Sequence, residues 1–157
     1  RRRHTRFRNV TGVQTCALPI FLSTVGLDTI PVTSYVGSSI SFSGLNPPAG
    51  QFKFSPDGKL AANALFDIGG PELFRFNNYT GTFSDPILLS TLEYRNYGLE
   101  FSRNSKYLYS SNIIFQKLYQ YDVSNFDSTI IVNSKVLIVD SLLHGLGSMQ
   151  MASDGKI

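Results

Sequence analysis

The chain has 157 residues, of which 42% are hydrophobic, 13% aromatic and 16% charged, with no Trp. This composition excludes an intrinsically disordered chain, because the charge is too low and the aromatic content too high. No stretch reaches the roughly 20 apolar residues that a membrane-spanning helix needs, so we expect no membrane span. The length suits one globular domain or a piece of one.

The first twenty residues differ sharply from the rest. Residues 1–20 contain five Arg and no Lys, Asp or Glu, which is typical of a nucleic-acid-binding arm or a transit peptide. They make a poor secretory signal, because no apolar run of the needed length follows the Arg cluster. The segment instead resembles a translated indexed sequencing adapter. The adapter's codons give residues 1–6, leave three codons for the index, and give residues 10–20, so that seventeen fixed residues stand in register. We interpret 1–20 as an artefact and exclude it from fold reasoning.

Charge and cysteine content change without that segment. In residues 21–157, nine Lys and Arg stand against eleven Asp and Glu, which makes the net charge −2, and no Cys remains. The argument from basic charge for nucleic-acid binding therefore disappears. Disulfides, Cys-ligated metal and a Cys nucleophile are excluded as well.

A repeat organises residues 21–157. Three segments resemble one another and are spaced 47 and 50 residues apart: Phe54–Leu60 (FSPDGKL), Phe101–Tyr107 (FSRNSKY) and Met151–Ile157 (MASDGKI). A second pair is LFRF, ending at Phe76, and LYQY, ending at Tyr121, 45 residues later. A third match, at a spacing of 55 residues, sets Phe76, Gly81, Pro86 and Ile87 against Phe21, Gly26, Pro31 and Val32.

Each repeat predicts four short strands. Strict alternation of apolar and polar residues indicates strands, and the Pro-Asp-Gly and Arg-Asn-Ser tripeptides indicate turns. The expected strands of the two complete units are listed in chain order: 51–54, 59–66, 72–76 and 86–91, then 99–101, 106–114, 117–121 and 129–139. No segment carries a convincing helical period, and β-branched residues favour a strand where the nearest candidate lies, at 134–143.

Four short strands in units of 45–50 residues are the signature of β-propeller blades. The predicted fold class is therefore all-β: a propeller fragment with about two full four-stranded antiparallel blades and parts of two others. The predicted divisions are a blade end (21–49), two blades (50–96 and 97–146) and a blade start (147–157). Another all-β solenoid or a sandwich is the alternative fold. Because a propeller typically needs 4–8 blades, we expect the missing blades of the same chain to be partners of this piece.

The repeats resemble the propeller family that includes YVTN repeats, lactonase-like propellers and WD-like SPDGK repeats. More narrowly, they resemble the repeat region of Bacteroidota surface proteins with gliding-motility-associated or type IX secretion type B sorting C-terminal domains. The runs that carry this likeness are GQFKFSPDGK (50–59), LFRFNNYTG (73–81), YGLEFSRNSKYLY (97–109), LYQYDV (118–123) and MQMASDGKI (149–157). The resemblance implies secretion to the cell surface, no catalysis, and a protein-, glycan- or adhesion-type role.

Candidate chemistry is sparse. His144 is the one His outside the first twenty residues, and a packed or solvated role is expected for it. Asp57 and Asp154 are expected to form turns. Gly69–Pro71 predicts a hairpin, because no strand–helix context for phosphate binding surrounds it. We therefore assign no catalytic, cofactor-binding or metal residues, and no cofactor.

Some motifs suggest modification. Asn78-Tyr79-Thr80 matches the N-glycosylation sequon. Three short segments, 28–30, 127–129 and 140–142, resemble an O-glycosylation pattern of Bacteroidota surface proteins. The Tyr and Phe residues fall mostly at strand positions of period two, so blade packing is expected for them rather than stacking on sugars or bases.

The leading functional hypothesis is a non-enzymatic propeller module of a secreted or cell-surface protein, with a scaffold, interaction or adhesion role. Its protein or glycan partner is unspecified, and no nucleic acid is expected. One alternative is a lactonase-type enzyme on the same fold, since a fold does not settle function. A TolB-like periplasmic partner-binding propeller is the other. A single His and three Glu argue against the enzyme.

Overall fold

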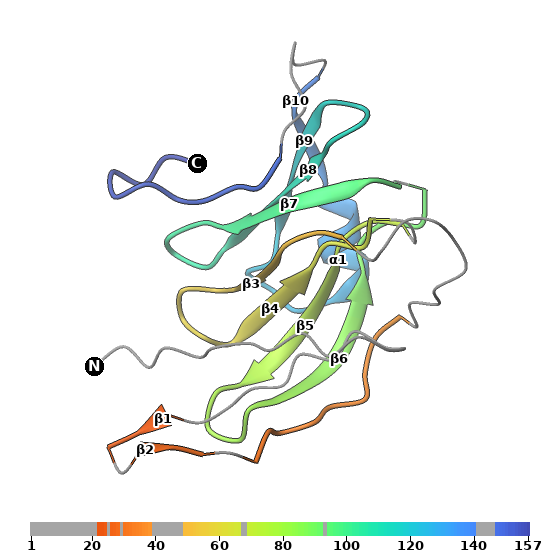
Figure 1. The fold of residues 1–157 in the computed structure, drawn as a ribbon. Coiled ribbons are helices and arrows are strands. Elements are labelled where there is room, and N and C mark those ends of the chain that lie inside the picture. Colours follow the sequence, from red (N-terminus) through yellow and green to blue (C-terminus); the bar gives the residue numbers. More distant parts are fainter. Residues whose placement is uncertain are drawn as a thin grey trace.

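A computed structural model describes residues 22–24, 26–28, 30–38, 49–66, 69–92, 94–140 and 147–157. Two four-stranded antiparallel sheets make up most of this part (Figure 1). The first has the order β3-β4-β5-β6, with strands Phe52–Phe54, Leu60–Asn63, Glu72–Asn77 and Thr82–Leu88. The second has the order β7-β8-β9-β10, with strands Asn96–Phe101, Tyr107–Asn112, Lys117–Asp122 and Val136–Val139. We call them blade 1 and blade 2; the all-β propeller-fragment prediction is confirmed.

The two blades have the same register. In blade 1 Leu60 pairs with Arg75, and in blade 2 Tyr107 pairs with Asp122, so both partners lie 47 residues further along. The structure therefore makes Phe74, not Phe76, the counterpart of Tyr121. The predicted spacing of 45 was wrong by two residues. A shift of two keeps every side chain on the same face, so the aromatic alternation alone did not reveal the error.

The connection before β10 contains a helix that the sequence analysis did not predict. A single strand was expected over 129–139, but α1 (Ser128–Asn133) precedes β10. Asp127 caps this helix, since its carboxylate accepts a hydrogen bond from the Ile130 N–H at 3.0 Å. Ile131 is fully buried in the core shared by the blades. Packing of this one side chain overrides the β-branched preference for strand.

Other strands also begin at residues that differ from the predicted ones. In blade 1 the fourth strand, β6, begins at Thr82 rather than at the expected Pro86. It continues directly from the β5–β6 turn, in which Asn77 pairs with Thr82. A small hairpin of β1 (Leu22–Ser23) and β2 (Gly26–Leu27) lies before blade 1. Its Leu22–Leu27 pair lies 55 residues before the Asn77–Thr82 pair of blade 1, so the two hairpins have the same register.

The core lies between the blades and on the face of blade 1 that points away from blade 2. Residues from both blades form the larger cluster: Leu60, Ala62, Ala64, Leu73, Leu89, Leu99, Phe101, Leu108, Tyr121, Val123 and Ile131. The other face of blade 1 holds Ala61, Phe74 and Phe83, with Val36, Phe52, Phe54 and Phe76 packed against them. Burial of both faces of one sheet is what radial stacking of blades requires. Among the described residues, no helix has the length and apolar character to cross a membrane.

Two ends of the blade stack are distinct. The β3–β4 and β7–β8 turns lie at one end, together with the turn at 152–156, and we call this the turn end (Figure 1). The β4–β5, β6–β7 and β8–β9 connections lie at the opposite end, which we call the loop end. Strands β3 and β7 are the first strands of their blades and contact each other directly.

Candidate functional site

The first strands of successive blades are joined by polar side chains. The Lys53 ammonium on β3 lies 2.9 Å from Glu100 Oε2 on β7. That same oxygen accepts a hydrogen bond from the Met151 N–H at 3.1 Å, in the segment that follows blade 2. Lys53 and Glu100 occupy equivalent positions, 47 residues apart, since each lies in the same register against its second strand.

Gln51 makes a second link over the same strands. Its Oε1 accepts from the Leu99 N–H and the Met149 N–H, each at 2.9 Å, and its Nε2 donates to the Met149 carbonyl at 3.2 Å. One amide therefore satisfies backbone groups in blade 2 and in the segment beyond it. We call Gln51, Lys53 and Glu100 the inner polar set.

Glu100 is held tightly. Its side chain is 11% exposed, and its Oε1 accepts from the Phe101 N–H at 3.0 Å while Oε2 bonds Lys53 and Met151. Each carboxylate oxygen therefore already accepts a hydrogen bond, which favours a structural role for Glu100 over proton abstraction. Lys53 and Glu100 are the two charged residues of strands β3 and β7.

The turn end repeats one hydrogen-bonding pattern. In the β3–β4 turn, the Ser55 hydroxyl donates to Asp57 Oδ1 at 2.6 Å and accepts from the Leu60 N–H at 2.9 Å. In the β7–β8 turn, Ser102 and Asn104 make the equivalent bond at 2.7 Å. Asp57 thus has the turn role that the sequence predicted, and Asn104 reproduces it without charge.

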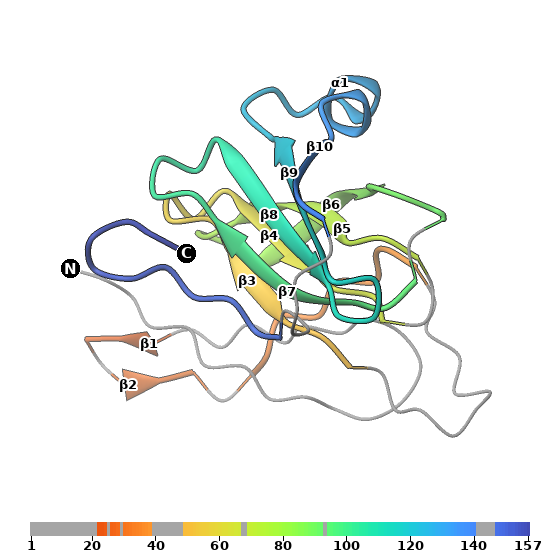
Figure 2. The same ribbon diagram turned by 90° about the horizontal axis from the view of Figure 1, so that it is seen from above.

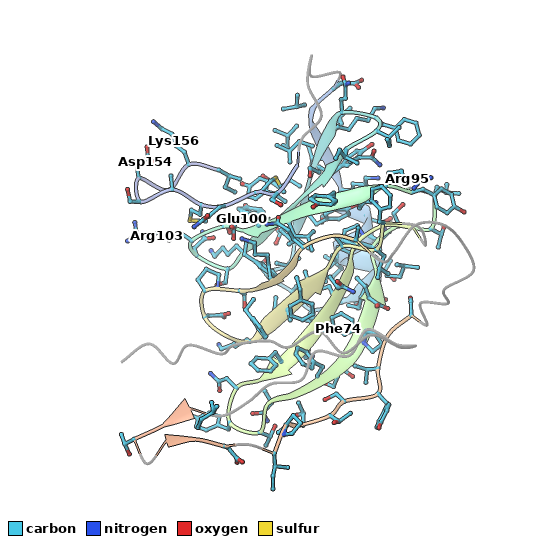
Figure 3. All side chains as sticks on the ribbon, in the orientation of Figure 1. Phe74, Arg95, Glu100, Arg103, Asp154 and Lys156 are labelled. Atoms are coloured by element: carbon cyan, nitrogen blue, oxygen red, sulfur yellow. The ribbon has the colours of Figure 1, made fainter. Side chains whose placement is uncertain are left out.

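The third turn and the charges around it complete this end. Asp154 Oδ1 accepts from the Lys156 N–H, and the Lys156 ammonium lies 3.2 Å from the Asp154 carboxylate. Figure 3 shows Arg103 of the β7–β8 turn on the same side as Asp154 and Lys156. The Asp57 N–H donates to the Ser105 hydroxyl at 3.1 Å, which joins the first two turns.

The remaining sequence-predicted residues lie apart from the inner polar set. Gly69–Pro71 belongs to the β4–β5 connection, where the Gly70 N–H donates to the Ser90 carbonyl. Asn78-Tyr79-Thr80 forms the exposed β5–β6 turn. Asp127 caps α1, and Asp140 pairs with Lys117 at 3.6 Å. His144, Thr29, Ser141 and Leu142 lie outside the described residues.

The inner polar set could not be recognised from the alternation of the strands alone. Lys53 and Glu100 were counted only as polar positions in alternating strands, although their 47-residue spacing was a usable signal. Gln51 gave no such signal, because its counterpart at that spacing, Gly98, has no side chain. Within the described part of the chain, no three His, Cys, Asp or Glu side chains gather into a possible metal site.

Comparison with solved structures shows that the chain shares the antiparallel propeller-type fold of two bacterial proteins. The chain is similar to a "putative 6-phosphogluconolactonase" from Bacteroides uniformis, with a TM-score of 0.52 and 17% identity over 90% of this chain and 39% of that one. It is also similar to a "putative 6-phosphogluconolactonase" from Bacteroides fragilis, with a TM-score of 0.52 and 14% identity over 87% of this chain and 39% of that one. The chain thus spans about two-fifths of the length of either structure.

These structures correct the leading functional hypothesis. A non-catalytic scaffold or adhesion module was expected, and the likeness to proteins with a lactonase name favours the lactonase-type alternative instead. The scarcity of His and Glu had argued against an enzyme, but it was counted over only part of a propeller. No family model matches the chain, and no curated protein does. The narrower resemblance to gliding-motility surface proteins therefore stays a prediction.

Proposed function

We propose that this chain is part of a β-propeller hydrolase that opens lactone rings. In that reaction water adds to the ring ester carbonyl, the ring C–O bond breaks, and the freed alkoxide takes a proton to give a hydroxy acid. The observation that carries the proposal is the shared fold with the two 6-phosphogluconolactonase-named structures.

The inner polar set supports a role for this chain in shaping the catalytic channel. The first strands of propeller blades surround the central channel, and ligands bind where the connecting loops meet it. Lys53 and Glu100 hold neighbouring first strands at a fixed separation through a 2.9 Å contact. We therefore assign Lys53 and Glu100 to positioning the channel wall. The side chains that act on the lactone would come from several blades around the propeller.

The test uses the complete propeller, recovered by long-read sequencing of unamplified DNA in both directions from this locus. Acid release from glucono-δ-lactone and 6-phosphoglucono-δ-lactone is followed with a pH indicator. We expect saturable hydrolysis above the spontaneous rate for at least one of them. The proposal would be overturned if the protein hydrolysed neither of these lactones, nor δ-decalactone, faster than buffer alone.

A variant pair tests the positioning role. Glu100→Gln keeps the side-chain shape but weakens the contact with Lys53, so we expect kcat/KM to fall by about tenfold, mainly through kcat. Tyr79→Ser, on the exposed β5–β6 turn, serves as the matched control and should leave both constants unchanged. Equal effects of the two variants would contradict the assignment.

The surface location is a separate part of the proposal. It rests on the resemblance of the repeats to Bacteroidota surface proteins. The same sequencing tests it, because a signal peptide upstream and a sorting domain downstream are the expected result. An open reading frame that lacks both would contradict secretion by that route.

A further inference from the structure

The loop end of blade 2 displays an apolar patch. Leu92 and Tyr94 of the β6–β7 connection are 85% and 52% exposed, and Ile114 and Phe115 of the β8–β9 turn are 59% and 57% exposed. We call these four residues the loop patch. Tips of β-hairpins are ordinarily built from Gly, Asn, Asp and Ser, so apolar side chains at such a tip need another explanation. Gathered exposed apolar side chains mark contact sites.

Hydrogen bonds hold the two loops of the patch together. Asn112 Nδ2 donates to the Tyr94 carbonyl at 2.6 Å, and the Ile113 N–H donates to the Arg95 carbonyl at 3.1 Å. Asn112 Oδ1 accepts from the Ile114 and Phe115 N–H groups. Tyr94, Ile114 and Phe115 are therefore displayed on backbone that is tied together by hydrogen bonds, which reduces the entropy lost when a ligand binds.

Local backbone strain adds to this picture. Arg95 and Gln116, which flank the patch, have positive φ values of 74° and 55°. Non-glycine residues in this region cost of order 1–3 kcal/mol each and cluster at ligand-binding sites. The guanidinium of Arg95 stacks over the Phe66 ring at 4.8 Å, so its charge lies against an aromatic face.

The patch lies where the first strand of blade 2 begins. Tyr94 and Arg95 immediately precede β7, and Figure 2 shows the β8–β9 turn beside the start of that strand. Figure 3 places Arg95 at the opposite end of the blade from Arg103, Asp154 and Lys156. The loop patch therefore lies at the opposite end of blade 2 from the charged side chains of the turn end.

The size of the patch indicates a small ligand. A stable protein interface buries about 800 Å² and 20–30 residues on each side, and four side chains fall far short of that. Small-molecule sites are lined mainly by apolar and aromatic side chains with few polar groups. The Tyr94 hydroxyl is the one polar side-chain group of the loop patch.

We propose that the loop patch binds the apolar substituent of the substrate, so that the preferred lactone carries an alkyl or aromatic group rather than a sugar-acid chain. This inference rests on the proposed lactonase function. It assigns specificity to Tyr94, Ile114 and Phe115, and bond making to groups elsewhere around the channel.

The experiment compares two lactones that have the same six-membered ring. The complete propeller is assayed with δ-decalactone and with glucono-δ-lactone. We expect kcat/KM to be at least about tenfold higher for δ-decalactone, since burial of a few methylenes supplies that discrimination. Phe115→Ser should raise KM for δ-decalactone about fivefold or more and leave KM for glucono-δ-lactone unchanged. Tyr79→Ser, an aromatic deletion on the exposed β5–β6 turn, should change neither.

Each contrary result has a separate meaning. Hydrolysis of glucono-δ-lactone with no preference for δ-decalactone overturns the loop-patch proposal and leaves the lactonase function standing. An equal KM effect of Phe115→Ser on both lactones overturns it too. If neither lactone is hydrolysed, saturation-transfer NMR with δ-decalactone tests whether the loop patch binds an apolar ligand. Transfer that is lost in Phe115→Ser supports an apolar-ligand site, and absence of transfer to the unmodified protein overturns it.

Discussion

Gly58 and Ser105 occupy the same position in two turns and show how one backbone demand is met by two residues. Their φ values are 71° and 60°, in the left-handed region that favours glycine. Gly58 meets this demand at no steric cost. Ser105 does not, but its hydroxyl accepts the Asp57 N–H and thereby joins the two blades. The departure from Pro-Asp-Gly in blade 2 thus places a non-glycine residue in a less favourable backbone conformation, and the Ser105 hydroxyl gains a hydrogen bond to the neighbouring turn.

Asp122 gives a prediction for acid sensitivity at the residue scale. Its carboxylate accepts from the Ser124 hydroxyl and, at 2.9 Å, from the Ser124 N–H. The Ser124 hydroxyl is the largest cause that lowers the pKa of Asp122 below 3.8, followed by the Ser124 N–H, with Lys106 adding a smaller attraction. Because the folded-state pKa is depressed, the stabilisation is present above the unfolded pKa and is lost as pH falls below it.

The measurement is an NMR titration of the Asp122 carboxyl carbon in the complete propeller. Ser124→Ala should raise the pKa of Asp122 toward 3.8 and make the acid limb of unfolding less steep below that pH. Ser153→Ala, at an exposed position of the third turn, serves as the control and should leave the titration unchanged. An unaltered pKa in Ser124→Ala would contradict the hydrogen-bond explanation.

At the scale of elements, the first strands of the blades are held in place by the Gln51 side-chain amide as well as by backbone pairing with their second strands. Gln51 satisfies three backbone groups, namely the Leu99 N–H and both the N–H and carbonyl of Met149. Gln51→Leu keeps the approximate volume and leaves all three without this partner. We expect it to destabilise the complete propeller by about 2–3 kcal/mol, because each unsatisfied, partly buried group costs about 1 kcal/mol or more.

Thermal unfolding of the complete propeller measures this effect. Gln51→Glu retains an acceptor for the two N–H groups but turns a carboxylate oxygen toward the Met149 carbonyl, so we expect it to recover only part of the lost stability. A Gln51→Leu protein with an unchanged Tm would show that water replaces the amide without cost.

Strand content and turn chemistry were predictable because they are local. The serine–aspartate pattern at Ser55 and Asp57 and the alternation on either side of it depend on near neighbours in the chain. The helix α1 was not predictable, since its formation depends on burial of Ile131 in a core cluster that residues of both blades form. The inner polar set was missed for the same reason: Lys53 and Glu100 meet only after two units, 47 residues apart, have stacked.

At the scale of the whole molecule, the described blades form an open stack. The outward side of blade 2 bears partly exposed residues of β10, including Val136, Leu137 and Ile138 at 44–48% exposure. A propeller needs about 4–8 blades to close, and each blade contacts only its neighbours. We therefore expect residues 21–157 alone to unfold without a sharp transition. Far-UV circular dichroism during heating checks this, and a cooperative transition in a monodisperse monomer would contradict it.

The reach of Gln51 also bears on how such a propeller evolves. Blade duplication is simplest when each unit interacts only with the units directly before and after it. Here one amide extends from blade 1 past the first strand of blade 2 to the segment that follows it. A single duplicated blade inserted after blade 2 would have to present a matching backbone to that amide. We therefore expect such an insertion to be tolerated only where the first strand of the new blade brings a backbone N–H and carbonyl to the positions that Met149 occupies here.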